Sequence, residues 1–440
     1  MIPLPLAEVA ELAPGRLDRA PDAPEEVTGL TIDSRRVAPG DLFVAVGRGH
    51  QFTADALDAG AAAALLPDDA FGALAALARA VRERSSAHVV AITGSIAKTS
   101  TKDILAALCR PHRRTVAAEG SQNNEIGLPL TLTRIEPDTE VVVLEMGMRG
   151  VGQIAELCAT ARPDVGVITK IGPVHLELLG TLEAVAEAKA ELIRDLEPHG
   201  TAVVPAGDRL LEPHLDHVEA EIVHFGPGGD VALRSFAPHG DRSQVELDAF
   251  GERLTLELPF ASRYNAENLL AALAAYRALG LPLDRAQDGA TEIRLSRWRG
   301  EESPLPGGGL LINDAYNANP LSMAAALEHL AERAAGRRTV ACLGDMAELG
   351  PGAAAYHREV GAAAARVGVG ALVAIGPLAR GYLEGARGIA ETHWAHGLED
   401  GLAALRRVIR PGDCVLLKAS RAMGFEEIAD ALTVVSSEAV

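Results

Sequence analysis

Residues 89–103, VVAITGSIAKTSTKD, decide the fold of the central part of the chain. The run from Val89 to Thr93 is β-branched and small apolar, which predicts a buried strand, and the small residues 94–97 predict a tight loop. Lys98 and Thr99 then open a stretch that predicts a helix. A strand, a small-residue loop and Lys-Thr at a helix start form the local context of a phosphate-binding loop, because backbone N–H groups and the positive end of a helix dipole favour polyphosphate.

The residue types in this loop suggest individual roles. Lys98 can reach terminal phosphates, and the Thr99 hydroxyl can hold Mg²⁺. Ala97 stands where such loops usually have glycine, and its β-carbon would cost about 1 kcal/mol if the backbone there has a positive φ. The alternative interpretation is an ordinary strand-to-helix turn with a surface lysine.

The length and composition exclude several classes of protein. A chain of 440 residues is too long for one core, so two or three domains are expected, and strands that alternate with Ala/Leu-rich helical segments predict an α/β fold with mostly parallel sheets. The net charge of −19 argues against nucleic-acid binding. The start of the chain has neither a basic segment nor a long apolar run, so we expect a cytoplasmic enzyme without a membrane span. The cysteines lack metal-ligand spacing.

The pattern of elements divides the chain into three parts. The expected domains are residues 1–86, 87–293 and 294–440, with the first boundary at a short Ser/Ala stretch. The second part contains the phosphate-binding loop. The third part repeats strand and helix without a second such loop, which predicts a Rossmann-like domain.

Polar residues follow several predicted strands directly. Glu145 ends the apolar run 141–144, and His175 lies shortly after the run 165–169. Ligands of open parallel sheets bind at the carboxyl ends of the strands, so Glu145 is a plausible Mg²⁺ ligand. The alternatives are that Glu145 caps a helix and that His175 is structural. Lys189, in the helix predicted for residues 181–196, would by the same reasoning lie on a solvated helix face.

The sequence resembles the Mur ligase family along nearly its full length. The segments that carry the resemblance are, in order, IDSRRVAPGDLFVAV, TGSIAKTSTKD, SQNNEIGLPLTL, VVVLEMGM, HLELLGTLEAVAEAKAEL, NDAYNANPLSM, LGDMAELG and LLKASRAMGFE. Each segment alone is weak evidence for the family, but eight such segments in the family's order are specific for it. NDAYNANP and LGDMAELG are most similar to the members that join D-alanyl-D-alanine to a UDP-N-acetylmuramoyl tripeptide.

The resemblance implies a fold and a reaction. It implies a small leading α/β domain that binds the UDP-linked substrate, a central P-loop ATPase-like domain with a parallel sheet, and a carboxy-terminal Rossmann-like domain that binds the dipeptide. ATP would phosphorylate a substrate carboxylate, and an amine would attack the acyl phosphate. The implied cofactors are ATP and Mg²⁺, the implied partners are the UDP-linked muramoyl peptide and D-alanyl-D-alanine, and we expect a monomer that binds no nucleic acid.

The resemblance also implies roles for individual residues. The implied catalytic residues are Lys98, His175, Lys189 and Arg299, and Lys189 would be the family's lysine that is often carbamylated. The implied metal ligands are Thr99, Glu145 and His175. The implied ATP-binding residues are Gly94, Ser95, Ile96, Ala97, Lys98, Thr99, Ser100, Asn268, Arg299, Asp314 and Tyr316. The implied substrate-binding residues are Ser34, Arg35, Asn123, Asn124, Asn317, Asn319, Lys418, Ser420 and Arg421.

Four features depart from the family pattern. Ala97 replaces a glycine, Tyr264 stands where a histidine is common, Lys170 replaces a common asparagine, and the segment around residues 50–52 is short. Two alternatives therefore remain: a paralogue that joins a different acid and amine, and a catalytically impaired nucleotide-binding protein.

Overall fold

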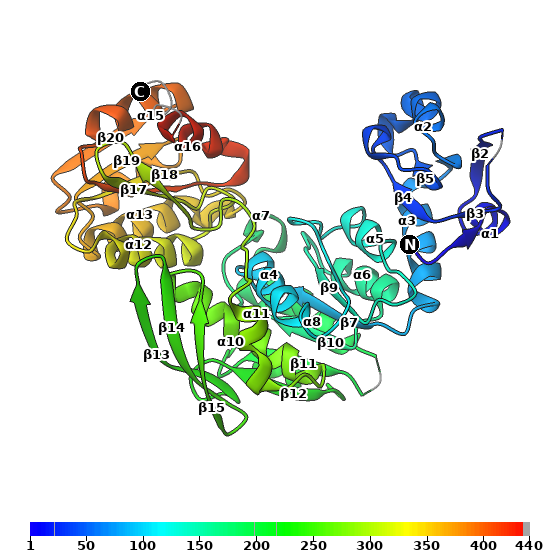
Figure 1. Cartoon of the computed structure of the whole chain (residues 1–440). Coiled ribbons are helices and arrows are strands. Elements are labelled where there is room, and N and C mark those ends of the chain that lie inside the picture. The colour runs from blue at the N-terminus through cyan, green and yellow to red at the C-terminus, as the bar shows by residue number, and fades with distance from the viewer. Residues whose placement is uncertain (22, 198, 217, 434–440) are drawn as a thin grey trace.

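The computed structural model describes residues 1–21, 23–197, 199–216 and 218–433, which form three lobes in an open V (Figure 1). The first lobe (blue) and the last lobe (yellow to red) both stand on the central lobe (cyan to green). Residues 434–440 of the third predicted domain lie outside the described residues. Among the described helices, none combines the length and apolar character that a membrane span requires.

The first lobe contains a four-stranded sheet in the order β2-β6-β5-β4, in which only the β2–β6 pair is antiparallel. Its last helix, α3 (Ala70–Glu83), packs against α5 (Gly127–Leu132) and α6 (Gln153–Ala161) of the central lobe. Leu74 and Leu77 of α3 share a core with Ile154 of α6. The first lobe therefore sits on the central lobe through α3. Its elements are β1 (Leu4–Pro5), α1 (Leu6–Leu12), β2 (Gly15–Arg19), β3 (Glu26–Val27), β4 (Gly29–Thr31), β5 (Asp41–Val44), α2 (Thr53–Asp58), β6 (Ala63–Pro67) and α3 (Ala70–Glu83), with 3₁₀ turns at Ser34–Arg36 and Gly47–Phe52.

The central lobe is built on a nine-stranded sheet in the order β15-β14-β13-β12-β11-β10-β7-β9-β8. Its strands are β7 (His88–Thr93), β8 (Thr115–Ala117), β9 (Val141–Glu145), β10 (Val165–Ile168), β11 (Thr201–Pro205), β12 (Glu221–Phe225), β13 (Val231–His239), β14 (Arg242–Ala249) and β15 (Glu252–Leu258). Its helices are α4 (Lys98–Cys109), α5 (Gly127–Leu132), α6 (Gln153–Ala161), α7 (Leu176–Leu179), α8 (Leu182–Arg194), α9 (Glu212–Leu215), α10 (Arg263–Ala278) and α11 (Gln287–Ala290), with a 3₁₀ turn at Leu283–Arg285.

Strand β7 is the switch point of this sheet. The chain runs from β7 to β8 and β9 on one side and then crosses to β10, β11 and β12 on the other. Val89 and Ala91 face one core cluster and Val90 and Ile92 face the other, so β7 is covered on both faces. Burial on both faces explains the continuous apolar sequence of β7. The change of direction in the strand order opens a crevice at the carboxyl end of β7, between β9 and β10.

The sheet is not entirely parallel, because β13, β14 and β15 pair in antiparallel fashion at one edge. Buried and exposed residues alternate along β14, as expected for a strand with one face on α10 and the other in water. The predicted α/β class with mostly parallel sheets is nevertheless confirmed.

The last lobe has a six-stranded sheet in the order β16-β17-β21-β18-β19-β20, in which only β16 is antiparallel to its neighbour. Helices cover both faces of this sheet. Its elements are β16 (Glu301–Leu305), β17 (Gly309–Asn313), α12 (Pro320–Ala334), β18 (Thr339–Gly344), α13 (Ala353–Arg366), β19 (Ala371–Ile375), α14 (Arg380–Gly385), β20 (Glu391–Ala395), α15 (Leu398–Val408), β21 (Cys414–Lys418) and α16 (Phe425–Thr433), with 3₁₀ turns at Gly350–Gly352 and Arg421–Met423.

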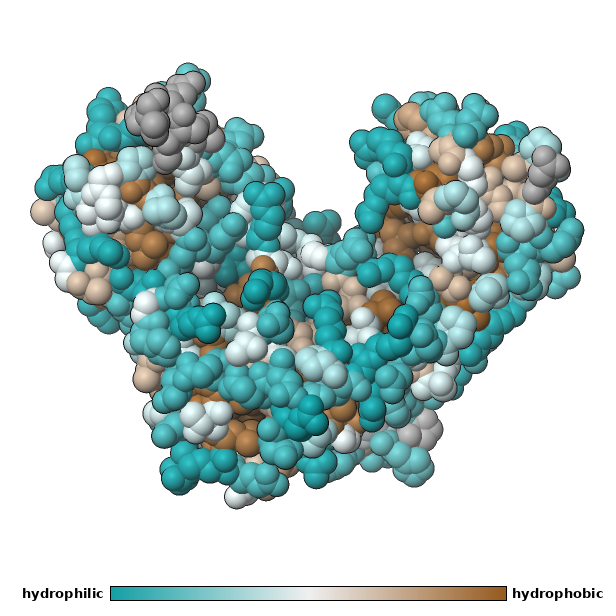
Figure 2. Space-filling view, in the orientation of Figure 1, coloured by the Kyte–Doolittle hydropathy of each residue, from teal (hydrophilic) through white to brown (hydrophobic). Residues whose placement is uncertain are grey.

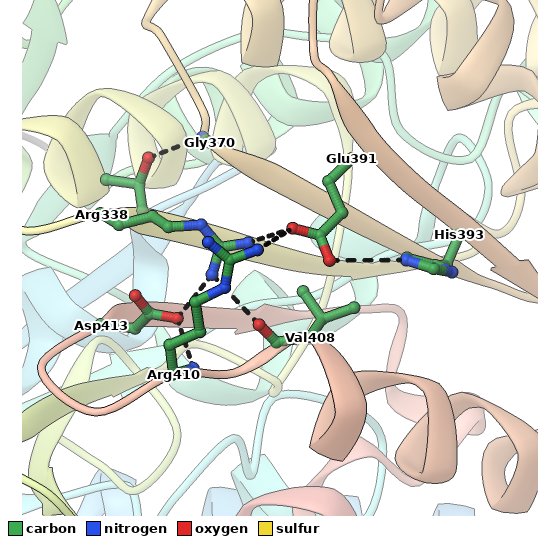
Figure 3. A network of polar contacts seen from close by, with 8 residues as sticks. Arg338, Gly370, Glu391, His393, Val408, Arg410 and Asp413 are labelled. Carbon is green, nitrogen blue, oxygen red and sulfur yellow. Dashed lines mark hydrogen bonds and ion pairs between the residues drawn. The ribbon is translucent and has the colours of Figure 1, made fainter.

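The amino ends of the strands in this lobe are joined by ion pairs (Figure 3). Arg338, just before β18, donates to Asp413 at 2.8 Å and to Glu391 at 2.5 Å. Arg410 donates to the same Glu391 oxygen at 3.0 Å. Asp413 is almost fully buried, so these contacts fix β18, β20 and β21 at the edge opposite to the one where ligands bind.

Candidate active site

A cavity of 1490 Å³ lies along the carboxyl ends of both large sheets. It is lined by residues from all three lobes, from Phe71 of α3 to Arg421 after β21. Figure 2 shows the hollow between the first and last lobes into which this region opens. The cavity therefore brings together groups that lie more than 300 residues apart in the chain.

The loop between β7 and α4 forms one wall of the cavity. Lys98 is the first residue of α4, and its ammonium group folds back to donate to the Gly94 carbonyl at 2.7 Å. The Ser95 hydroxyl accepts from the Gly172 N–H at 2.9 Å and donates to the Gly172 carbonyl at 3.0 Å. These bonds fix the loop, so the first turn of a 12-residue helix lies at the cavity wall.

Ala97 has a left-handed backbone conformation, with φ 69° and ψ −5°. The positive φ expected for this position is therefore present, although the residue has a side chain. A side chain is not tolerated at Gly94, because a β-carbon there would lie 1.9 Å from the Thr169 hydroxyl oxygen. The loop thus needs a glycine at Gly94 and tolerates strain at Ala97.

Glu145 is the centre of a buried polar cluster beneath the loop. Its carboxylate is 1% exposed and accepts from the Thr99 hydroxyl at 2.8 Å and from the Asn123 amide at 2.7 Å. Arg299 of the last lobe donates to the Thr99 hydroxyl oxygen at 2.9 Å. The register pairs Glu145 with Ile92, which places the end of β9 beside the end of β7.

Two lysines that line the cavity, Lys98 and Lys189, have pKa values below the usual value for lysine. Burial lowers the pKa of Lys98, although the neighbouring Glu145 carboxylate raises it. Lys189, on α8, is 1% exposed, and burial lowers its pKa well below the usual value, with the charge of Lys98 lowering it further. Within the described part of the chain, the Lys189 ammonium makes no hydrogen bond or ion pair. Burial therefore disfavours the charged form of Lys189.

His175 joins the central lobe to the last lobe. It lies at the start of α7, and its Nδ1 contacts the Glu348 carboxylate at 2.5 Å. Burial lowers the pKa of His175, while Glu348 raises it. The other oxygen of Glu348 lies 3.6 Å from the Arg149 guanidinium.

The last lobe contributes a second buried cluster. Lys418, at the end of β21, donates to the Asp314 carboxylate at 2.5 Å and to the Asn317 carbonyl at 3.0 Å. The Arg299 guanidinium lies 3.8 Å from the centre of the Tyr316 ring, and the Tyr316 hydroxyl contacts Ser121 of the central lobe. Arg299 therefore bridges the two clusters.

Two family profiles match this chain. The Mur ligase middle domain matches residues 92–276, and the Mur ligase, glutamate ligase domain matches residues 298–421. The chain belongs to the Mur ligase family. The predicted resemblance is confirmed.

Relatives with a curated name cover nearly the whole chain. The UDP-N-acetylmuramoyl-tripeptide–D-alanyl-D-alanine ligases of Synechocystis and Bacillus subtilis are 34% and 32% identical to it, over 92% and 97% of this chain and 92% and 98% of their own length. MurF from Acinetobacter baumannii superposes with a TM-score of 0.88 at 28% identity, with 98% of each chain covered. MurF ligase from Thermotoga maritima in complex with ADP superposes with a TM-score of 0.80 at 29% identity, with 92% of this chain and 96% of that one covered. The three-domain architecture of the Mur ligases is thus confirmed.

Most of the residues that the sequence predicts for the site of this Mur ligase line the one cavity. They are Ser95, Ile96, Ala97, Lys98, Thr99, Ser100, Asn123, Asn124, Glu145, His175, Lys189, Asn268, Arg299, Asp314, Tyr316, Asn317, Asn319, Lys418 and Arg421. Gly94 adjoins this lining as the residue before Ser95. The departures Lys170 and Tyr264 line the same cavity.

Besides Gly94, three predicted residues lie outside the lining. Ser34 and Arg35 lie in a 3₁₀ turn of the first lobe, where the exposed Arg35 donates to Asp33 at 2.8 Å and its guanidinium lowers the pKa of Asp33 to about 2. Ser420 is buried, and its hydroxyl accepts from the Ala347 N–H at 2.8 Å. In this conformation Ser420 holds the loop that follows β18.

Sequence reasoning gave no role to three residues that the structure places in the site. Glu348 contacts both Arg149 and His175, and Ser121 contacts Tyr316. Each lies in a polar segment that follows a strand, namely β8, β9 or β18, and polar residues after strands are a signal that the sequence carries. Their partners, however, belong to another lobe and could not be found from local sequence.

The strain at Ala97 gives a testable expectation. Ala97→Gly is expected to leave the free energy of unfolding unchanged or to raise it by up to about 1 kcal/mol, because glycine removes left-handed strain but loses more entropy on folding. Ala97→Val is expected to lower it by about 1–3 kcal/mol, because a β-branched residue fits this conformation poorly. Urea denaturation followed by circular dichroism measures both. A less stable glycine variant would contradict this account and show that the loop depends on the alanine methyl group.

Proposed function

We propose that this Mur ligase joins D-alanyl-D-alanine to a UDP-N-acetylmuramoyl tripeptide, with ATP converted to ADP and phosphate. The named relatives that match over more than nine-tenths of the chain support this assignment. The single observation that supports the chemistry is the cavity, which combines a phosphate-loop geometry with buried cations from two lobes. The product would be a peptidoglycan precursor.

We further propose the division predicted from the sequence, with residues 1–86 binding the UDP-linked substrate, 87–293 binding ATP and 294–440 binding the dipeptide. The strands of the three main sheets fall within these ranges. Ser34, Arg35, Asn123 and Asn124 would contact the UDP-linked substrate. The residues assigned to the dipeptide side are Asn317, Asn319, Lys418, Ser420 and Arg421.

ATP would place its phosphates on the loop 94–100. The amino end of α4 offers backbone N–H groups to them, and Lys98 would exchange its bond with the Gly94 carbonyl for one with phosphate. Arg299 stacks on Tyr316 beside this loop and would reach the γ-phosphate. Asn268, on the first turns of α10, would meet adenine, and Asp314 would lie on the ribose side.

The residues at Glu145 fit a magnesium ion. The hydroxyl of Thr99 and the carboxylate of Glu145 are hard oxygen donors 2.8 Å apart, and Mg²⁺ at phosphate sites takes one or two carboxylates together with phosphate and water oxygens. His175 would help to hold a second ion. The described residues include no group of three or more His, Cys, Asp or Glu side chains that could form a metal site. Bound Mg²⁺ would neutralise charge between the triphosphate and the substrate carboxylate.

The reaction would proceed in two displacements. A carboxylate oxygen of the tripeptide attacks the γ-phosphorus, the bond to the bridging oxygen breaks, and ADP leaves an acyl phosphate behind. The dipeptide amine then attacks the carbonyl carbon, loses a proton, and phosphate departs. Lys98 and Arg299 are needed because the carboxylate and the triphosphate repel each other, and fixed cations in a buried site offset this repulsion.

Lys189 would act as a carbamate. A neutral lysine amine attacks CO₂, the new C–N bond forms and one proton is released, which converts the neutral amine into an anionic carbamate. The buried Lys189 is suited to this reaction, since burial lowers its pKa and the described residues give its ammonium no partner. The resulting carboxylate would supply the extra negative ligand for the second metal ion.

A phosphate-release assay tests the proposed function. With ATP, Mg²⁺ and UDP-N-acetylmuramoyl tripeptide, phosphate release is expected only when D-alanyl-D-alanine is also present, with a product mass equal to the two substrates less one water. Lys98→Ala is expected to lower the rate roughly 10²- to 10³-fold, because it removes a cation from the phosphates. Release with another acid–amine pair and not with this one would indicate a paralogue. ATP binding without release for any pair would indicate an impaired enzyme.

The carbamate gives a second expectation. In CO₂-depleted buffer the rate is expected to fall and to recover when bicarbonate is added, more steeply at lower pH because protonated amine does not react with CO₂. Lys189→Arg is expected to be nearly inactive with no bicarbonate response, since guanidinium stays charged. Lys170→Arg is the matched control, because Lys170 lines the same cavity but is exposed and should keep the response. Equal wild-type rates with and without CO₂ would refute the carbamate.

A further inference from the structure

The loop that follows β18, residues 345–350, lies against the segment of the central lobe that contains His175 and Glu177. The Glu177 N–H donates to the Glu348 carbonyl at 3.3 Å. A β-carbon on Gly350 would lie 3.2 Å from the Glu177 nitrogen, so the two backbones approach closely and only glycine fits without a shift. The two lobes therefore meet here in one defined backbone-to-backbone contact.

The loop is held rigidly by its own lobe. The Met346 N–H donates to Nε2 of the buried His357 at 3.0 Å, and the Ala347 N–H donates to the Ser420 hydroxyl at 2.8 Å. The Asp345 carboxylate accepts from the Ala379 N–H at 2.6 Å. Three successive residues are therefore fixed before Glu348, so the position of its side chain follows the position of the whole lobe.

The contact between Glu348 and His175 defines where the ring proton lies. A carboxylate only accepts hydrogen bonds, so Nδ1 of His175 must carry the proton that Glu348 accepts. In the neutral ring, Nε2 is then unprotonated and can bind a metal ion or accept a hydrogen bond. The Arg149 guanidinium lies 3.6 Å from the other Glu348 oxygen, so both oxygens of this carboxylate have a partner.

Both residues have backbone conformations that favour glycine. Glu348 has φ 61° and His175 has φ 53°. Two strained residues with functional side chains meet here across a boundary between lobes. Glycine would relieve the strain at either position but would remove the contact, so the side chains themselves account for the residues found there.

We infer that Glu348 is a positioning residue through which docking of the last lobe sets the tautomer and orientation of His175. This rests on the proposed function only in the role given to His175 as a ligand of a second metal ion. When the lobe is docked, Nε2 of His175 is available, and when the lobe moves away, the ring loses the acceptor that fixes it. Closure of the lobes would then complete the site instead of only enclosing the substrates.

The test compares Glu348→Ala and the nearly isosteric Glu348→Gln with wild type. Glu384→Ala is the matched control, because Glu384 is an exposed carboxylate of the same lobe whose partner is Arg358. ¹⁵N-histidine NMR of each protein without ligands reads the tautomer of His175, which is assigned by its loss in His175→Ala. Thermal unfolding checks that each variant folds, and steady-state kinetics separate kcat from KM.

The expected result in wild type and in the control is a protonated Nδ1 and an unprotonated Nε2. In both Glu348 variants a mixed tautomer is expected, with kcat lowered roughly 10- to 100-fold and KM for ATP little changed. In the His175→Ala background, adding a Glu348 variant is expected to cause no further loss. A wild-type tautomer and a wild-type kcat in Glu348→Ala would overturn the inference, as would losses that multiply in the double variant. The tautomer measurement needs no substrate, so it stands even if the proposed ligase activity fails.

Discussion

The site depends on the buried carboxylate of Glu145 at the end of β9. Its two oxygens accept from Thr99 on α4 and from Asn123 in the next loop, so one acidic group ties the phosphate loop to the following segment of the central lobe. A carboxylate that is 1% exposed needs such partners or a cation, because an unpaired buried charge is expensive. The sheet fixes the position of Glu145, since β9 and β10 flank β7 at the switch point of the sheet.

The same demand for paired charge explains how the lobes meet. Arg299 crosses from the last lobe to the Thr99 hydroxyl, and Glu348 crosses to His175. Lys418 donates to the Asp314 carboxylate and to the Asn317 carbonyl at the cavity wall. It would bind a substrate carboxylate only by giving up one of these hydrogen bonds. A Mur ligase that must hold two anions together thus presents its cations in preformed hydrogen-bonded positions, which reduces reorganisation during reaction.

The sequence predicted the parts of the site that are local and left out those that are not. The run before Thr93, the loop to Ala97 and the helix from Lys98 follow from apolar pattern and small residues, and the structure has them at β7 and α4. Ser34 and Arg35 were assigned by resemblance, and they lie on the separate first lobe, outside the cavity. The roles of Ser420 and Glu348 depend on contacts with a loop and a lobe that local sequence does not encode.

The central claim is that phosphates and a metal ion assemble between the β7–α4 loop and Glu145. The most direct measurement is a crystal structure of the protein with a non-hydrolysable ATP analogue and Mn²⁺, with the metal located by its anomalous signal. The account predicts the phosphates on the turn between Thr93 and Thr99 and the metal beside Glu145. A nucleotide bound elsewhere, with no metal near Glu145, would contradict it and would leave only the fold and family assignment.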